Sequence, residues 1–365
     1  MLKKLEYNKI VIFIAFLLFI LVYHYYAVVD PVLLRNGDDW RYFGSFVSHP
    51  IPRVGWWNVT RILPEYLMPL TGYFSAFFIY PLVGDYLGAA SVTLALLIAM
   101  SITVLFLCLY RLFVTLCDNK TICALVSVMA IILSFAFFKD NPDSNVHMFF
   151  ATQYNLYFFY VLPNILNSLI VLELMRQLVI RETPATDTPF IRKGWLFVGI
   201  YFCIFSMLFS AGILLSFAVA ILVHELFFSL RTDEKIPIRL RMFFQSCMKN
   251  HIVAVIIVVM TVMAMLLELT SIRSNTMFPE TYFGSIFSAE FIRRIGTSAI
   301  NIYLLARSMS KYIFFIMLFI TLTAIVLFII KPQSRSSKAI CLTVKSLIAG
   351  LFLFVFYINL HLCRF

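Results

Sequence analysis

Long apolar runs that recur along the chain constrain its fold more than any other feature. The stretches "IVIFIAFLLFILVY" (residues 10–23) and "AVIIVVMTVMAMLLEL" (residues 254–269) are apolar on every helical face, whereas a helix in a water-soluble protein is apolar along one stripe. A helix of about 20 such residues crosses the hydrocarbon core of a bilayer. Strands of outer-membrane barrels alternate between apolar and polar residues, and these runs do not. The sequence therefore predicts an all-α polytopic membrane protein.

Runs of spanning length lie near 9–29, 87–112, 121–138, 156–179, 195–230, 252–270, 312–330 and 339–360. The run at 195–230 has room for two crossings with a tight turn near "FSAGIL" (residues 209–214), which gives nine helices. The N-terminal "MLKKLEYNK" leads into its run without a small-residue cleavage site, so we expect a retained first helix rather than a signal peptide. The chain shows no repeat of fixed period, and residues 1–365 are expected to form a single domain.

The charges predict how the chain is oriented. Lys and Arg number 29 against 18 Asp and Glu, a net charge of +11 that could indicate a nucleic-acid partner. Most of these Lys and Arg residues instead lie in short loops such as 181–194, 231–250 and 331–338. Loops rich in Lys and Arg stay in the cytosol. We therefore expect no nucleic-acid partner and a cytosolic N-terminus. Residues 30–86, 139–155 and 271–311 then face outside, which in a bacterium is the periplasmic side of the inner membrane.

Two segments do not fit a simple count of spans. The stretch "YLMPLTGYFSAFFIYPLVG" (residues 66–84) could be a tenth span, which would invert every later loop. Interruption by Pro64, Pro69, Gly72 and Pro81 favours an interfacial or re-entrant segment instead. Residues 286–308 similarly look like an amphipathic helix on the outer interface.

An acidic pair, Asp38 and Asp39, opens the first external segment in "LLRNGDDWRYFG" (residues 33–44). An Asp at bilayer depth costs about 2.5–3.5 kcal/mol, so a pair at a helix exit indicates a loop or an aqueous pocket. A structural role, capping the short helix that follows, explains the pair about as well. Long loops tend to be functional, and this one also contains aromatic and basic residues at Trp40, Arg41, Arg53, Trp56, Trp57 and Arg61. Such tryptophans suit sugars and are equally typical of a membrane interface.

An N-terminal helix, a large external loop opening with "NGDDW", and the later stretch "GWWNVTRILPEYL" (residues 55–67) resemble the membrane-integral C-type (GT-C) glycosyltransferase superfamily. The chain is most similar to bacterial glucosyltransferases that use lipid-linked sugars to modify O-antigen and convert serotype. The specific likeness covers about residues 1–70. It implies a bundle of about 9 to 11 transmembrane helices with interfacial helices. It also implies a polyprenyl-phosphate (undecaprenyl-type) donor of a hexose such as glucose, an external acceptor hydroxyl on a lipopolysaccharide glycan, and inversion at the anomeric carbon. Asp38 and Asp39 match the acidic motif of the family's first loop.

The chemistry of such a transfer divides its tasks between one carboxylate base and several cations. A polyprenyl phosphate leaves as a stable anion, so the reaction needs one base at the acceptor hydroxyl and cations at the departing phosphate. Adjacent side chains point in different directions, so Asp38 and Asp39 are expected to differ in role. We favour Asp38 as the base and Asp39 as an organiser of hydrogen bonds or a metal contact, although the reverse is nearly as consistent. Arg293 and Arg294 are the first candidates for the phosphate, and Arg273 and Arg307 belong to the same predicted external segment, 271–311. Snorkelling to lipid headgroups would account for these arginines equally well.

Other side chains are weaker candidates. Contacts to the sugar are predicted for Trp40, Arg41, Trp56, Trp57, Arg61, Glu65, His147, Gln153 and Tyr154. The seven cysteines show no CxxC or Cys/His ligand spacing, so no disulfide and no structural zinc is expected. His224-Glu225 is not an HExxH motif. A divalent cation, Mg²⁺ or Mn²⁺, is the one cofactor that the acidic pair suggests.

Two other classes of protein compete with this interpretation. An O-antigen polymerase or ligase uses the same lipid carrier and would make the arginines central. A flippase or transporter of lipid-linked sugars would place charged or Gly/Pro-broken segments at mid-membrane. The predicted spans are nearly free of charge, with Lys345 an exception, and this distribution favours surface chemistry.

Overall fold

The computed structural model describes residues 9–35, 37–117, 119–136, 153–180, 190–230 and 236–273. In these residues the secondary structure is helical apart from one isolated bridge between Leu33 and Gln153. Six helical segments there are long and apolar enough to cross a membrane: Lys9–Val29, Ile62–Val83, Tyr86–Leu116, Tyr154–Leu178, Leu208–Phe227 and Ile252–Leu269. Lys120–Phe135 and Gly194–Ile204 are shorter apolar helices. These findings support a membrane-embedded helical protein; the predicted helices at 286–308, 312–330 and 339–360 lie outside the described residues.

The helices are α1 (Lys9–His24), η1 (Tyr25–Val29), α2 (Gly37–Gly44), α3 (Ile62–Phe74), η2 (Ser75–Ile79), α4 (Tyr80–Val83), α5 (Tyr86–Leu116), α6 (Lys120–Ala136), α7 (Tyr154–Leu156), η4 (Tyr157–Val161), α8 (Leu162–Ile180), α9 (Phe190–Ile204), α10 (Leu208–Leu230), α11 (Ile236–Asn250) and α12 (Ile252–Leu269). They form two compact units, one of residues 1–48 and 63–176 and one of residues 49–62 and 177–365. The chain passes between the units repeatedly, so this division leaves the single-domain prediction open.

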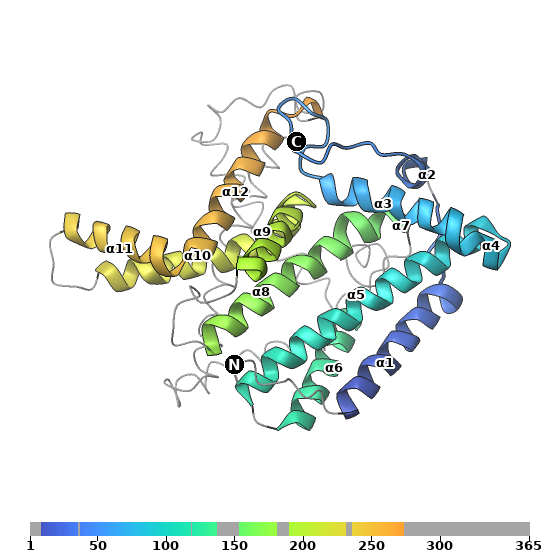
Figure 1. Cartoon of the computed structure of the whole chain (residues 1–365), viewed down its shortest axis with the longest axis horizontal. Helices are drawn as coiled ribbons and strands as arrows, with labels where there is room; N and C mark the ends of the chain where they lie inside the picture. Colours follow the sequence, from blue (N-terminus) through green and yellow to red (C-terminus); the bar gives the residue numbers. More distant parts are fainter. Residues whose placement is uncertain are drawn as a thin grey trace, which may run out of the picture. The chain divides into compact units, whose positions relative to one another are not determined.

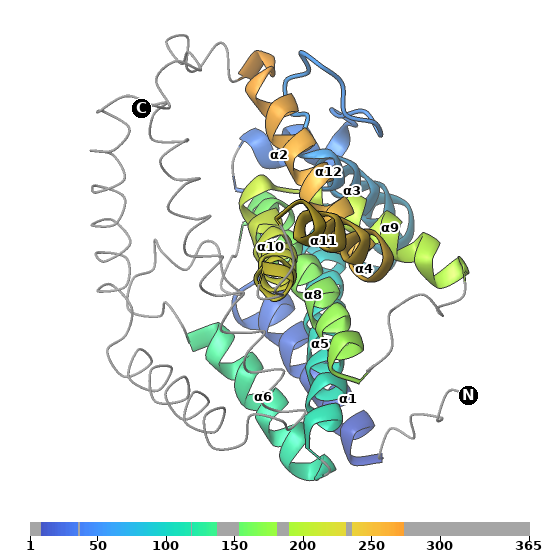
Figure 2. The same ribbon diagram turned by 90° about the vertical axis from the view of Figure 1, so that its left-hand side faces the viewer.

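The first unit is built on α1, α5 and the continuous helix α7–η4–α8. Helices α1 and α5 lie side by side (Figure 1 and Figure 2). Small buried residues on α5, such as Ala95 and Ala99, let a neighbouring helix approach closely. Packing of this kind drives the association of helices in a bilayer, where lipid is as apolar as the side chains.

Three contacts fix the direction of these helices. The Leu33–Gln153 bridge sets the exit from α1 beside the start of α7. Further along, Tyr157 Oη hydrogen-bonds Ser101 Oγ of α5 at 2.8 Å, and Glu173 of α8 lies near Arg111 of α5. Helices α5 and α8 therefore run in the same direction, and α1 runs opposite to both. The exit of α1, the start of α5 and the start of α7 share one end of the unit, which we call the α2 end.

A tight turn joins α4 to α5 at the α2 end. Gly84 adopts a left-handed conformation (φ 75°), and its N–H donates to the Tyr80 carbonyl at 2.8 Å. Asp85 then caps α5, accepting from the Gly88 N–H at 2.6 Å. This glycine and aspartate reverse the chain in two residues because one tolerates a positive φ and the other satisfies a free donor.

Residues 62–83 form a helical segment that is not interrupted by its prolines, so the expected interruption is wrong. Pro64 occupies the first turn of α3, where its missing N–H has no intrahelical partner to lose. Pro81 lies at the start of α4, directly after the π-turn η2. Pro69 lies inside α3, and the helix passes it and continues into the π-turn η2.

The second unit contains α9 to α12 among its described residues. The apolar run at 195–230 forms two helices as expected, but the predicted turn at 209–214 is wrong, because these residues are helical and the break lies at 205–207. Ser206 Oγ donates to the Cys203 carbonyl at 2.7 Å and satisfies a free acceptor at the end of α9. Gly212 has no positive φ and continues α10.

Candidate functional site

Asp39 is a buried carboxylate that accepts two backbone hydrogen bonds at the α2 end of the first unit. Its side chain is 0% exposed. Oδ2 accepts from the Arg35 backbone N–H at 2.8 Å, and Oδ1 accepts from the Asn155 backbone N–H at 2.8 Å. Neither donor follows Asp39 within α2, so these bonds differ from the helix cap that the sequence suggested as an alternative. The carboxylate joins the segment after α1 to the start of α7.

The bond to Asn155 caps a long helix from a distant part of the chain. Asn155 lies in the first turn of the continuous helix 154–180, where backbone N–H groups have no intrahelical partner. The local N-cap residue, Gln153, makes no side-chain cap hydrogen bond. Asp39 supplies the missing acceptor at the positive end of the helix dipole, an arrangement that stabilises the start of the helix.

Asp38 has the opposite environment. It occupies the first turn of α2, and its side chain is exposed. Trp40 is 49% exposed, and Arg41 is exposed with its guanidinium carbon 5.9 Å from the centre of the Tyr42 ring. A rigidly held carboxylate and an accessible one thus stand next to each other, and the accessible one has an indole and a guanidinium on the same short helix.

Close packing against α3 holds α2 in place. A Cβ added at Gly72 of α3 would lie 2.2 Å from the Phe43 carbonyl oxygen, so the two backbones touch where glycine leaves room. The Phe46 ring packs against Tyr66 and Tyr73, with ring centres 5.4 and 5.8 Å apart. The short helix α2, which carries Asp38, is therefore held by close packing against α3.

Two predicted sugar-binding residues of this unit are fully buried. Tyr154 packs edge-on against Phe43 at 5.0 Å, and its hydroxyl hydrogen-bonds Thr71 Oγ1. Glu65 of α3 is also 0% exposed. Gln153 is half-buried at the Leu33 bridge. In this structure Tyr154 helps to pack α2, α3 and α7 together, and contact of these three residues with a sugar stays a prediction.

The described charges of the first unit separate toward its two ends. The α2 end has five carboxylates and two guanidiniums, from Asp30, Arg35, Asp38, Asp39, Arg41, Glu65 and Asp85. The opposite end, where α5 and α8 finish, has four basic residues and one acid, from Lys9, Arg111, Lys120, Glu173 and Arg176. The spans between them are uncharged in the described residues, as a bilayer core requires.

The other loop candidates belong to the second unit. Trp57 is 39% exposed, Trp56 packs edge-on against the His49 ring at 4.3 Å, and Arg61 is half-buried. Thr60 Oγ1 donates to Glu268 Oε2 of α12 at 2.9 Å, which ties this part of the loop to the end of a span. Residues 30–86 are thus divided between the two units, and no feature of the sequence indicates that division.

Most of the predicted phosphate and loop ligands cannot be placed. Arg293, Arg294, Arg307 and His147 lie outside the described residues. Arg273 is half-buried just after α12. Their assignment to the donor phosphate stays a prediction.

The acidic pair does not fit a divalent cation well. Both Asp39 oxygens already accept backbone N–H bonds, and an N–H group directed at an oxygen competes with a cation for its lone pairs. Within the described ranges no three His, Cys, Asp or Glu residues gather closely enough to hold a metal ion. We therefore derive no step through a metal.

Comparison of the chain with known protein families, with curated proteins and with solved structures finds no match. The class that the described residues define is a helical, membrane-embedded protein with an acidic pair at one end of its first unit.

Proposed function

We propose that the chain is an inverting, membrane-integral glycosyltransferase that moves a sugar from a polyprenyl-phosphate donor to a hydroxyl of a bacterial cell-surface glycan such as O-antigen. The observation that supports this most directly is the contrast within the acidic pair. Asp39 is buried and held by two backbone N–H groups, and Asp38 is exposed beside it. One accessible carboxylate on a fixed support is what a single-base transfer requires.

In the proposed reaction Asp38 takes the proton from the acceptor hydroxyl as its oxygen attacks the anomeric carbon. The bond between that carbon and the phosphate oxygen breaks, and the polyprenyl phosphate leaves with the electron pair. The configuration at the anomeric carbon inverts because attack and departure occur on opposite faces. The exposed Trp40 ring offers an apolar face to the sugar, and Arg41 offers a cation to the phosphate.

The charge separation in the first unit supports the orientation that this function needs. The positive-inside rule assigns the basic end to the cytosol, so the α2 end with Asp38 faces the periplasm. The helix directions add an argument about residues 62–83. Since α1 exits and α5 enters at the same end, and α2 packs along α3 there, this segment begins and finishes on one side of the membrane. It then lies in the outer interface, with Tyr73, Phe77 and Tyr80 among its exposed side chains.

The test uses the purified full-length protein with synthetic polyprenyl-phosphate hexoses and O-antigen-bearing lipopolysaccharide, with acceptor mass as the readout. The wild type is expected to add one hexose mass. Asp38→Asn is expected to reduce the rate by about 10²–10⁴-fold, the usual contribution of a general base. Asp30→Asn, which removes another acid from the same end outside α2, is the matched control and is expected to keep activity.

Two results would contradict the proposal. One is the absence of transfer from every polyprenyl-phosphate hexose tried, with protein that is folded by its thermal unfolding curve. The other is an Asp38→Asn variant with substantial activity, which would favour a polymerase or ligase whose arginines carry the chemistry.

A further inference from the structure

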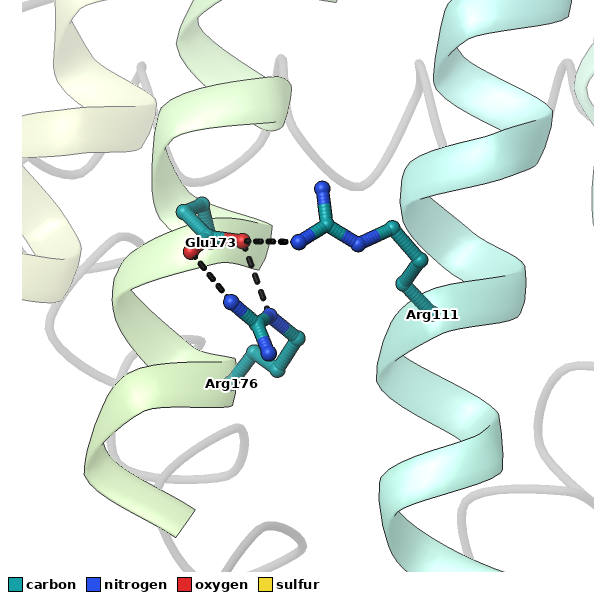
Figure 3. A network of polar contacts seen from close by, with 3 residues as sticks. All are labelled: Arg111, Glu173 and Arg176. Atoms are coloured by element: carbon teal, nitrogen blue, oxygen red, sulfur yellow. Dashed lines mark hydrogen bonds and ion pairs between the residues drawn. The ribbon is translucent and has the colours of Figure 1, made fainter. Parts of the chain in front are cut away.

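A second polar cluster lies between α5 and α8, toward the basic end of the first unit and away from Asp38. Its members are Arg111 of α5 and Glu173 and Arg176 of α8 (Figure 3). Their side chains are 32%, 30% and 19% exposed, so water reaches the cluster only in part. Charged groups so close to the ends of two spans are costly unless they have partners.

Glu173 and Arg176 form a strong local pair. Arg176 Nε donates to Glu173 Oε2 at 2.9 Å, and its terminal Nη2 donates to Oε1 at 2.6 Å, so the guanidinium grips the carboxylate with two parallel bonds. This forked geometry is the strongest that an arginine and a carboxylate make. The negative charge of Glu173 is therefore matched within its own helix.

Arg111 is a second guanidinium beside a carboxylate that already has one. Its Nη2 lies 4.0 Å from Glu173 Oε2, beyond hydrogen-bond distance, and its Nε is buried without a hydrogen-bond partner among the described residues. Figure 3 shows one terminal nitrogen directed at Glu173 and the other turned away from it. An arginine has five N–H donors and remains charged at any physiological pH, so most of its bonding capacity here is unused.

The described residues around the cluster do not supply the missing negative charge. The cluster holds two cations and one anion, and the same end of the unit has Lys9 and Lys120 with no further acid among its described residues. An excess positive charge in a partly buried site attracts an anion more strongly than a fully solvated positive charge does. Guanidinium groups bind phosphate oxygens in particular, since the planar fork matches their spacing.

We propose that this cluster is a phosphate-binding site, with Arg111 as the principal ligand and Arg176 as the second cation. The phosphate belongs either to the headgroup of an anionic phospholipid in the adjoining leaflet or to a free anion, and both present the same oxygens. Glu173 orients Arg176 and lowers the affinity of the site, because its charge repels the incoming anion. The proposal does not depend on the glycosyltransferase activity.

The test is lipid retention measured by native mass spectrometry on the full-length protein in detergent, with phosphatidylglycerol or phosphatidylcholine added. Arg111→Gln is expected to weaken phosphatidylglycerol retention about five-fold, the usual effect of one basic residue near an anionic membrane. Lys120→Gln is the matched control, because it removes an exposed charge from the same end outside the cluster, and it is expected to cause a smaller loss. Glu173→Gln is expected to strengthen retention.

The Glu173 variant separates a binding site from a structural ion pair. If the three residues only hold α5 against α8, Glu173→Gln lowers the unfolding temperature and does not raise lipid retention, which overturns the proposal. Equal loss in the Arg111 and Lys120 variants, or none in either, overturns it as well. A second arm adds millimolar inorganic phosphate. Arg111-dependent binding of phosphate in the absence of lipid identifies a free anion as the ligand. Phosphatidylglycerol retention that added phosphate does not reduce identifies the headgroup.

Discussion

At the scale of single residues, two adjacent aspartates differ in everything except their chemistry. Neighbouring positions on a helix lie about 100° apart, so one side chain can point into the protein while the next points out. Asp39 points inward to two backbone N–H groups, and Asp38 is exposed. That the two side chains would point in different directions could be predicted from the sequence. The identity of the inward member could not, because its second donor is a backbone group 116 positions away at Asn155.

This difference predicts opposite effects on stability. Asp39→Asn replaces one accepting oxygen by an NH₂ group that faces another donor, so it is expected to lower the free energy of unfolding by about 1–3 kcal/mol, the cost of leaving a buried bond unmade. Asp38→Asn changes an exposed side chain and is expected to leave stability unchanged. Thermal unfolding of the full-length protein in detergent measures both. Equal unfolding temperatures for the two variants would show that the bonds to Arg35 and Asn155 do not stabilise the fold.

The candidate site as a whole could be predicted in composition but not in contacts. Trp40 and Arg41 follow the acidic pair in sequence, and a short helix keeps them near it. Tyr154 was expected to contact sugar because it is a polar aromatic in an external loop, yet it is buried against Phe43 and bonded to Thr71. Burial of a loop residue depends on tertiary packing, and a single sequence contains no signal for it. The Arg111 cluster could not be predicted for the same reason, because Arg111 lies 62 positions before Glu173 and 65 before Arg176.

At the scale of elements, the length of an apolar run predicts where a helix lies, but a single Pro or Gly does not predict where it breaks. The runs predicted at 9–29, 87–112 and 252–270 are helical to within a few residues. The breaks were less certain: Pro69 lies inside α3 and Gly212 inside α10. Glycine weakens helices in water, where freed backbone groups are readily solvated, but Gly212 lies in an apolar span, where a helix is the way to satisfy the rest of the backbone.

The close approach of α2 and α3 leads to a prediction at this scale. Gly72→Ala would place a Cβ 2.2 Å from the Phe43 carbonyl oxygen, and a backbone atom cannot move aside cheaply. The variant is expected to lose about 1–3 kcal/mol, as overpacked cores do. Gly212→Ala, also inside a helix but with nothing within 4 Å of the added Cβ, is the matched control. It is expected to be neutral or slightly stabilising, because alanine favours helices over glycine. Thermal unfolding compares the two, and similar losses in both would contradict the contact.

At the scale of the molecule, the charge distribution predicts the membrane orientation, and the helix directions predict that residues 62–83 begin and end on one side of the membrane. The positive-inside rule uses only the Lys and Arg content of each end of the first unit. The Tyr157–Ser101 hydrogen bond aligns η4 and α8 with α5, and the Leu33–Gln153 bridge places the exit of α1 beside the start of α7. Together these contacts favour the α2 end for both ends of residues 62–83. The sequence alone left that segment open as a tenth span. Its length and composition permit a crossing, and only the directions of its neighbours argue against one.

Labelling of single cysteines in intact cells tests this orientation. Cys117 is exposed just after α5, at the basic end, and Ser45 is exposed just after α2, at the α2 end. A membrane-impermeant maleimide is expected to label a Ser45→Cys variant in intact spheroplasts, and to label a variant that keeps only Cys117 after permeabilisation alone.

A variant that keeps only Cys247 serves as the control for accessibility. Burial, with a smaller effect of the Glu225 charge, raises the pKa of this thiol, so less of it is thiolate near neutral pH. Because the thiolate is the reactive form, Cys247 is expected to react more slowly than Cys117 after permeabilisation, and its rate is expected to keep rising at a higher pH. Labelling of Cys117 in intact spheroplasts, with Ser45→Cys protected, would put the acidic pair in the cytosol, and a periplasmic transfer to surface glycans would then be impossible at Asp38.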